Sequence, residues 1–183
     1  MSEMKLGPAA RYFDDFEIGE QFLTQGRTIS DVELTMWAMF SGDMNPFHID
    51  DVYAKEHSLF GGRFPQGLMA VGIASGLYER MGLFVGTGLA MTGQTITYRK
   101  PVLVGDTIYV RLTVAGLRPH PRRPAGTVTF GYEIIDSEST VFVDGEWGIL
   151  LASRAVNEAA QPIEAPPFEA QPNGARTKNG GSR

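Results

Sequence analysis

The 183-residue sequence predicts an α+β fold, in which a long buried central helix is wrapped by a curled antiparallel sheet of about five strands. Two observations predict it. The stretch after Pro65 is apolar on nearly every side, as expected of a helix inside the molecule. After Gly86 the period changes to alternating apolar and polar residues rich in Val, Ile, Thr and Tyr, which is typical of half-buried strands.

The first predicted elements are a strand near residues 21–28 and a helix that begins after Ser30. Ser30 and Glu33 have the spacing of a capping box, in which each side chain accepts a hydrogen bond from the backbone N–H of the other residue. Gly42 is the expected end of this helix. The apolar residues that follow at helical spacing predict one apolar face, made by Val32, Met36, Met39 and Phe40. A second, short helix is expected from Asp50, because acidic residues favour a helix N-terminus.

The central helix is expected to follow Pro65 and to carry many small residues, which indicates that another part of the backbone packs closely against it. Four strands of about ten residues each should then form an antiparallel meander. Their predicted ranges are 90–100, 106–118, 126–136 and 140–152. Turn signals rich in Gly, Pro, Asp and Ser separate them.

Composition predicts one folded domain over residues 1–156 and a disordered tail rich in Pro, Ala and Gly over residues 157–183. The net charge of −5 argues against a general nucleic-acid binder. The absence of cysteine excludes disulfides and thiolate chemistry, and we expect no metal site. No apolar run suffices to cross a bilayer and the N-terminus lacks a signal-peptide core, so we expect a cytoplasmic protein without a membrane partner.

One short stretch, SGDMNPFHID at residues 41–50, carries the chemistry of interest. It holds one of the three histidines, His48, five positions after Asp43, with an Asn-Pro turn between them. One interpretation is a polar turn, since Asp, Asn and Pro are common turn residues. The other is a pair of titratable side chains held at a fixed separation for acid–base catalysis. The stretch by itself leaves both open.

In its wider context the sequence resembles the MaoC-like, R-specific enoyl-CoA hydratases, which have the hotdog fold. The resemblance covers nearly all of the predicted folded part. It rests on the 41–50 stretch, on Phe60-Gly61-Gly62-Arg63, on Gly67 and Ser75 in the central helix, and on Pro101-Val102 followed by Gly105-Asp106. The sequence departs from the family pattern at Gln66, where the family usually has His. Glutamine can form hydrogen bonds but cannot titrate.

The resemblance implies a hydro-lyase that reversibly adds water to a trans-2-enoyl-CoA and gives the (R)-3-hydroxyacyl-CoA, with Asp43 and His48 as the pair that activates the water. Gly67 follows Pro65 at a helix N-terminus, so its backbone N–H is the expected donor to the enolate oxygen. Supporting roles fall to Asn45, which fixes the turn, and to Ser75, Gln66 and Arg63. Ser75 holds the active-site loop or serves only as a small residue for helix packing.

No cofactor is expected, because CoA enters as part of the thioester substrate. A homodimer or a dimer of dimers is expected, because a single curled sheet leaves an edge strand unpaired. Two other functions stay open at this point. One is an acyl-CoA thioesterase, which the same fold also hosts, and the other is a non-catalytic acyl-CoA binder, for which Gln66 is the only hint.

Overall fold

The computed structural model describes residues 10–155 and contains the predicted helix and sheet layers. The predicted tail, residues 157–183, and the domain boundary at residue 156 lie outside the described residues. The elements are, in chain order, η1 (Phe13–Asp15), β1 (Gln21–Leu23), β2 (Arg27–Thr28), α1 (Asp31–Ser41), α2 (Pro46–Ile49), α3 (Asp51–His57), α4 (Gly67–Glu79), β3 (Gly88–Tyr98), β4 (Thr107–Pro119), β5 (Ala125–Ile135) and β6 (Val141–Ala152).

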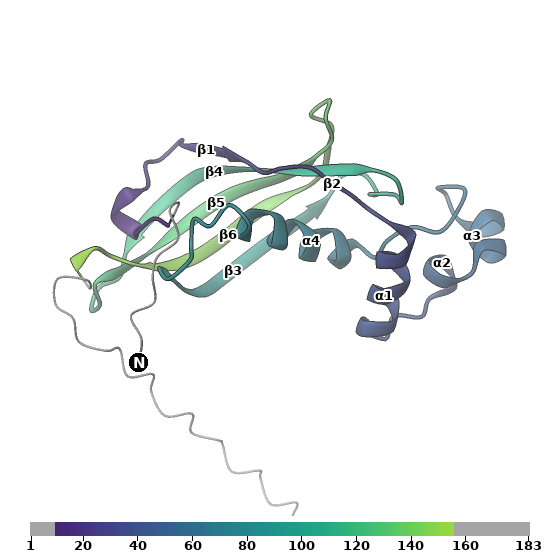
Figure 1. The fold of residues 1–183 in the computed structure, drawn as a ribbon, viewed down its shortest axis with the longest axis horizontal. Helices are drawn as coiled ribbons and strands as arrows, with labels where there is room; N and C mark the ends of the chain where they lie inside the picture. Colours follow the sequence, from purple (N-terminus) through teal and green to yellow (C-terminus); the bar gives the residue numbers. More distant parts are fainter. Residues whose placement is uncertain (1–9, 156–183) are drawn as a thin grey trace, which may run out of the picture.

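The sheet is antiparallel, with the strand order β1-β4-β5-β6-β3, and β2 also pairs with β4. Helix α4 lies along one face of the sheet, while α1, α2 and α3 gather beyond the N-terminal end of α4 (Figure 1). The predicted α+β class is therefore confirmed. The described sheet has six strands where about five were expected, because the strand predicted near residues 21–28 is two short strands that pair with different parts of β4.

The core lies between α4 and the inner face of the sheet. One side of α4 is buried, through Met69, Ala70, Val71, Ala74, Leu77 and Tyr78. From the sheet, large side chains such as Phe130, Tyr132 and Trp147 fill the space opposite. The rings of Tyr132 and Trp147 stack with their centroids 3.8 Å apart. Side chains that alternate along the strands thus meet a helix that is nearly free of polar groups.

Helix α4 is not enclosed on all sides, which corrects the expectation from its sequence. Leu68 is 59% exposed, and Gly76 lies on the same uncovered side. The reason is geometric: within one chain the sheet covers a single side of the helix (Figure 1). An apolar sequence on every side therefore leaves apolar surface for another contact.

Helix α1 begins as predicted, with Ser30 as its N-cap and Glu33 completing the capping box, and it ends at Gly42 in the left-handed conformation. Its predicted apolar face, however, points outward. Leu34 and Ala38 are its buried residues, and Trp37 packs against the core partly buried. The exposed fractions are 66% for Val32, 63% for Met36, 70% for Met39 and 86% for Phe40. The spacing correctly predicted a helix with an apolar stripe but did not predict which way that stripe faces.

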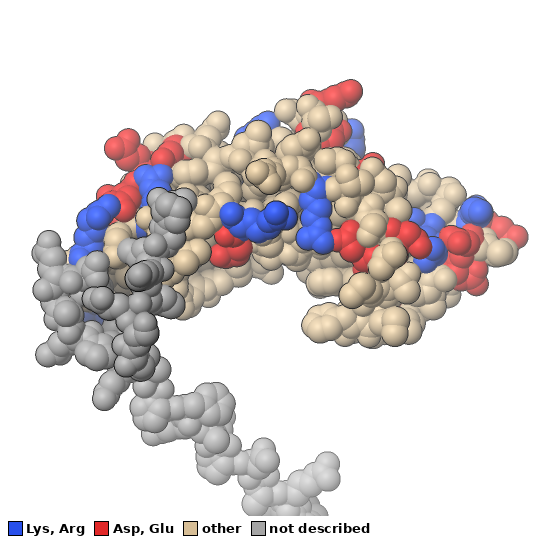
Figure 2. Space-filling view, in the orientation of Figure 1, with Lys and Arg blue, Asp and Glu red and all other residues tan. Residues whose placement is uncertain are grey.

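The lower end of α1 projects beside the concave underside of the molecule and carries no charged side chain in this view (Figure 2). Strand β3 is likewise accessible, because in the described part of the chain it pairs only with β6 and lies at one end of the strand order. Leu89, Met91 and Tyr98 on this strand are exposed large hydrophobic residues. Within residues 10–155, no helix is long and apolar enough to span a membrane.

The close approach of β6 and β3 depends on Gly145. A Cβ at this position would run into the main-chain oxygen of Thr95 on β3 and would lie 3.0 Å from the ring of Tyr132. We expect Gly145→Ala to lower the free energy of unfolding by about 1–3 kcal/mol, because backbone has to move to admit the methyl group. Thermal unfolding should show a decrease of about 2–4 °C per kcal/mol. The matched control is Gly131→Ala in β5, where the nearest atom lies 3.8 Å from the added Cβ. Equal melting temperatures for the two variants would contradict the prediction.

Candidate active site

The residues between α1 and α3 form a chain of helix caps. After Gly42 the backbone leaves α1, and Asn45 then caps α2 by accepting a hydrogen bond from the backbone N–H of Phe47. Pro46 occupies the first turn of α2, where its missing N–H has no cost. Asp50 closes α2 and caps α3 through bonds from the N–H groups of Val52 and Tyr53. These caps hold Asp43 in the loop and place His48 on α2.

Asp43 and His48 face each other. The distance from His48 Nε2 to Asp43 Oδ2 is 3.7 Å, and the exposed fractions of the two side chains are 9% for His48 and 49% for Asp43. The imidazole also lies edge-on to the Phe64 ring, with centroids 5.2 Å apart. The structure therefore brings together the two side chains that the sequence singled out, one shielded from solvent and one open to it.

The contacts of His48 fix its tautomer. Its Nδ1 lies 2.6 Å from the main-chain oxygen of Phe64. A carbonyl oxygen only accepts hydrogen bonds, so Nδ1 carries the hydrogen and Nε2 presents a lone pair when the ring is neutral. Nε2 and the Asp43 carboxylate are then two acceptors that face each other. A water molecule has two O–H groups and can donate one to each, which is the arrangement needed to hold and deprotonate a nucleophilic water.

Gln66 joins this pair to the start of α4. Its Nε2 donates a hydrogen bond of 3.2 Å to the main-chain oxygen of Asp43, and Gln66 is also the N-cap residue of α4. The residue is 7% exposed, and its Oε1 is a buried acceptor without a hydrogen-bond partner among the described residues. Gln66 therefore offers a further acceptor close to Asp43, but one that cannot take up a proton.

Gly67 is the first residue of α4, where backbone N–H groups have no acceptor within the helix. The Gln66 side chain does not cap these groups. The positive end of the helix dipole adds to their attraction for negative charge. The position of Gly67 suits a backbone donor to a developing oxyanion.

The structure places the two other supporting residues differently. The Ser75 hydroxyl donates to the main-chain oxygen of Gly72 within α4, at 2.7 Å, and makes no described hydrogen bond to the 41–50 loop. Arg63 lies close to the pair, since its Nη1 is 3.5 Å from the main-chain oxygen of His48. Its guanidinium also bridges Asp31 at 2.6 Å and Asp51 at 2.8 Å. The hydrogen bond to Asp51, with that to Asp31, raises the pKa of Arg63 above its ordinary value.

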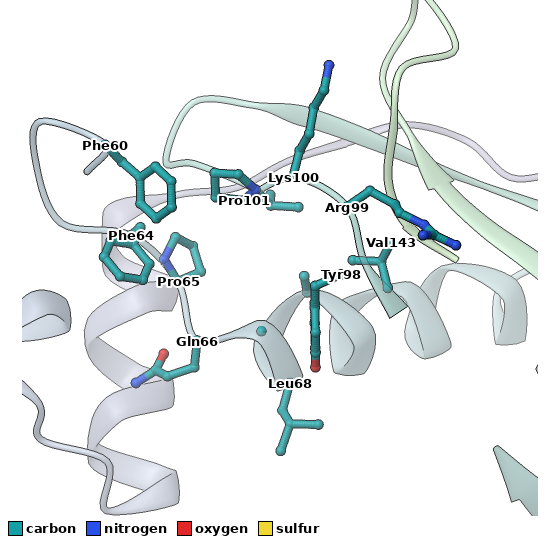
Figure 3. Close-up of a pocket in the computed structure, with 13 residues that line it drawn as sticks. Phe60, Phe64, Pro65, Gln66, Leu68, Tyr98, Arg99, Lys100, Pro101 and Val143 are labelled. Atoms are coloured by element: carbon teal, nitrogen blue, oxygen red, sulfur yellow. The ribbon is translucent and has the colours of Figure 1, made fainter. Parts of the chain in front are cut away.

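A cavity of 480 Å³ opens at the N-terminus of α4 (Figure 3). Gln66 and Gly67 belong to its lining, whereas Asp43 and His48 do not, so the cavity and the acid–base pair meet at Gln66. Most of the lining is apolar, and Arg99 and Lys100 also belong to it. The other lining residues are Phe60, Phe64, Pro65, Leu68, Ala70, Tyr98, Pro101, Val102 and Val143.

Sequence reasoning missed Tyr98 as part of this site. It is the last residue of β3 and is read from the sequence as one of several aromatic residues in alternating strands. Figure 3 shows its ring alongside the first turn of α4, with the hydroxyl near Leu68 and with Gln66 pointing away from it. No pattern in the sequence could link residue 98 to residue 67, because their contact depends on the packing of β3 beside α4.

The chain matches a known protein family over most of its described residues. A family described as "MaoC like domain" matches residues 15–134. The chain belongs to the MaoC-like family. This membership confirms the family predicted from the sequence.

Relatives within the MaoC-like family are similar over most of their length. The (R)-specific enoyl-CoA hydratase of Rhodospirillum rubrum is 32% identical over 136 residues, which cover 72% of this chain and 91% of that protein. A 3-hydroxybutyryl-CoA dehydratase of Methylorubrum extorquens is 33% identical over 135 residues, which cover 72% of this chain and 83% of the relative. The predicted enzyme class, hydratases and dehydratases, is therefore confirmed at the level of the MaoC-like family.

Solved structures confirm the predicted hotdog fold. A MaoC-like dehydratase from Rhodospirillum rubrum superposes with a TM-score of 0.71 at 23% identity, over 79% of this chain and 98% of that chain. A protein from Mycobacterium tuberculosis with a double hotdog fold gives a TM-score of 0.68 at 23% identity, over 86% of this chain and 47% of that chain.

The ion pairs of Arg63 with Asp31 and Asp51 should stabilise the fold of this MaoC-like protein next to the candidate site. Arg63→Lys keeps the charge but loses the planar fork that reaches Asp31 and Asp51 together. We expect a loss of about 1 kcal/mol in the free energy of unfolding, seen as a melting temperature lower by about 2–4 °C, and a larger loss at low salt than at high salt. The matched control is Arg99→Lys, because Arg99, which directly follows β3, pairs with Asp144 of β6 at the surface. An Arg63→Lys protein no less stable than the Arg99→Lys protein would contradict this role.

Proposed function

We propose that this protein is a hydro-lyase that reversibly adds water to a trans-2-enoyl-CoA and gives the (R)-3-hydroxyacyl-CoA. One observation carries the proposal: His48 Nε2 and the Asp43 carboxylate face each other at 3.7 Å, beside a helix N-terminus that lines an apolar cavity. The names of the relatives, an (R)-specific enoyl-CoA hydratase and a 3-hydroxybutyryl-CoA dehydratase, support the reaction class and the CoA thioester. The (R) configuration rests on the first of those names.

The proposed reaction assigns a role to each part of the site. The thioester lies in the cavity with its carbonyl oxygen at the backbone N–H of Gly67, and the β-carbon lies towards the water held by Asp43 and His48. The water oxygen bonds to the β-carbon as one of its protons passes to the pair, and the electrons of the double bond move onto the thioester as an enolate. A proton returned by the pair to the α-carbon completes the addition. No group beyond the CoA of the substrate is needed.

A thioesterase would aim the water at the thioester carbonyl and would not need a proton at the α-carbon. The pairing of Asp43 with His48, which could accept a proton and return it, supports the hydro-lyase. The two activities differ in their products, so the substrate test described below separates them.

We further propose that the protein is a homodimer, or a dimer of dimers. Among residues 10–155, strand β3 leaves one edge of the sheet without a partner, and Met91 on this strand is 49% exposed. Unpaired edges of this length are normally covered. A second copy of the chain offers the same edge, and two such edges can pair antiparallel about a twofold axis.

The acid–base pair is tested by replacing each member. Asp43→Asn keeps the shape of the side chain but cannot take a proton, so hydration of crotonyl-CoA should fall by about 10²–10⁴. His48→Gln should fall comparably, and the double variant should lose far less than the product of the two effects, because both groups act on one water. The matched control is His57→Gln, on the exposed surface of α3, which should keep full activity.

The measurement follows the loss of enoyl absorbance and, in parallel, the release of free thiol. If the unmutated protein releases CoA from a saturated acyl-CoA faster than it hydrates any enoyl-CoA, the protein is a thioesterase. If it does neither but binds acyl-CoA, it is a binding protein. Full hydratase activity of Asp43→Asn would show that the proton carrier lies elsewhere.

The dimer is tested by the mass in solution at micromolar concentration. Met91→Lys places a like charge on each copy of the free β3 edge and should shift the population towards monomer. The matched control is Leu23→Lys on β1, a residue that is 61% exposed at the opposite edge of the sheet. This control should leave the mass unchanged. A monomeric, fully active unmutated protein would refute the dimer.

A further inference from the structure

Tyr98 lies against the residue that begins α4. A Cβ placed on Gly67 would lie 2.6 Å and 2.7 Å from two ring carbons of Tyr98 and 3.0 Å from its hydroxyl oxygen. Only a residue without a side chain can therefore stand at position 67 while Tyr98 keeps this place. The phenol hydroxyl is consequently a close neighbour of the Gly67 backbone, although β3 and α4 are separate elements.

The hydroxyl of Tyr98 is available as a donor. It makes no hydrogen bond to any group within residues 10–155. Burial raises the pKa of the Tyr98 phenol above its ordinary value, so the hydroxyl keeps its proton at neutral pH. A phenol that is neutral and not already bonded can donate to an incoming ligand atom.

The surroundings leave such a donor accessible from the cavity. Tyr98 and Gly67 line the same cavity, together with the apolar side chains of Phe64, Pro65 and Leu68. Tyr98 is 50% exposed in the single chain, so its hydroxyl is open to an incoming ligand. An oxygen that develops negative charge at the first turn of α4 would therefore meet two donors from different parts of the fold.

We propose that the hydroxyl of Tyr98 is a second donor to the thioester oxygen, acting together with the backbone N–H of Gly67. This inference rests on the proposed hydro-lyase function and deepens it. Tyr98 donates a hydrogen bond and transfers no proton. The negative charge that forms on the thioester oxygen, as water adds to the β-carbon, is shared by the N–H and the O–H until the α-carbon is protonated.

The chain offers a matched control for simple ring packing. Tyr109 on β4 packs against Gly26 in nearly the same way, since a Cβ on Gly26 would lie 2.7 Å from two ring carbons and 3.0 Å from the hydroxyl oxygen of Tyr109. Neither Gly26 nor Tyr109 lines the cavity at the start of α4. The effect of Tyr109→Phe therefore shows how much the hydroxyl of a tyrosine packed on a glycine contributes to folding, without any role at the candidate site.

The experiment compares Tyr98→Phe with Tyr109→Phe and the unmutated protein in the hydration of crotonyl-CoA. Tyr98→Phe should lower kcat by about 10²-fold, the usual effect of losing one oxyanion donor, with KM nearly unchanged because the bond strengthens only as charge develops. Tyr109→Phe should keep its full kcat. Melting temperatures of the two variants should agree, since each keeps its ring.

A second readout does not depend on turnover. The carbonyl stretch of crotonyl-CoA, measured by isotope-edited infrared spectroscopy in the slow Asp43→Asn protein, falls in frequency as hydrogen bonds polarise the carbonyl. Adding Tyr98→Phe should raise that frequency, and adding Tyr109→Phe should not. Together the two readouts separate a donor from a packing residue.

The outcomes are distinct. If the unmutated protein hydrates crotonyl-CoA and Tyr98→Phe stays within about threefold of it, the proposal for Tyr98 is overturned and the hydro-lyase stands. An equal loss in both tyrosine variants, or an unchanged carbonyl frequency, also overturns it. If the unmutated protein hydrates no enoyl-CoA, the proposed function fails first, and the role of Tyr98 fails with it.

Discussion

The packing of α4 against the inner face of the sheet is the constraint on which the rest of the structure depends. Its buried side, from Met69 to Tyr78, fixes both the direction of the helix and the place where it begins. That place decides where the free N–H groups of the first turn point. It also sets how closely the end of β3 approaches the helix, and hence the contact between Gly67 and Tyr98. The apolar core thus positions a polar site that lies at its edge.

The acid–base pair depends on this frame through two hydrogen bonds. Phe64, in the segment that leads into α4, accepts from His48, and Gln66 at the N-cap of α4 donates to the main chain of Asp43. Phe47 of α2 also accepts a backbone hydrogen bond from Phe64 and packs against its ring, and Arg63 bridges Asp31 of α1 and Asp51 of α3. In this way Asp43 and His48 are tied to the segment that begins α4. A small displacement of the helix would alter the whole arrangement.

The same packing leaves apolar surface uncovered. One sheet cannot enclose a helix that is apolar on every side, so Leu68 and the outward stripe of α1 stay accessible in the single chain. Gly67 and Gln66 lie at the boundary between the covered and uncovered sides of α4. The candidate site is therefore built where the chain has apolar surface to offer to a ligand or to another chain.

The sequence alone determined the helix and strand order, the capping box at Ser30 and the 41–50 stretch, because these depend on local period and on side chains that bond to nearby backbone. It also carried the resemblance by which the family was predicted. Only the tertiary structure decided which side of α1 and α4 faces the core, since periodicity gives a stripe without a direction. The tertiary structure likewise placed Tyr98 on Gly67 and Gln66 on Asp43, contacts between residues 31 and 23 positions apart. Such contacts follow from how distant segments pack, and no local pattern in the chain encodes them.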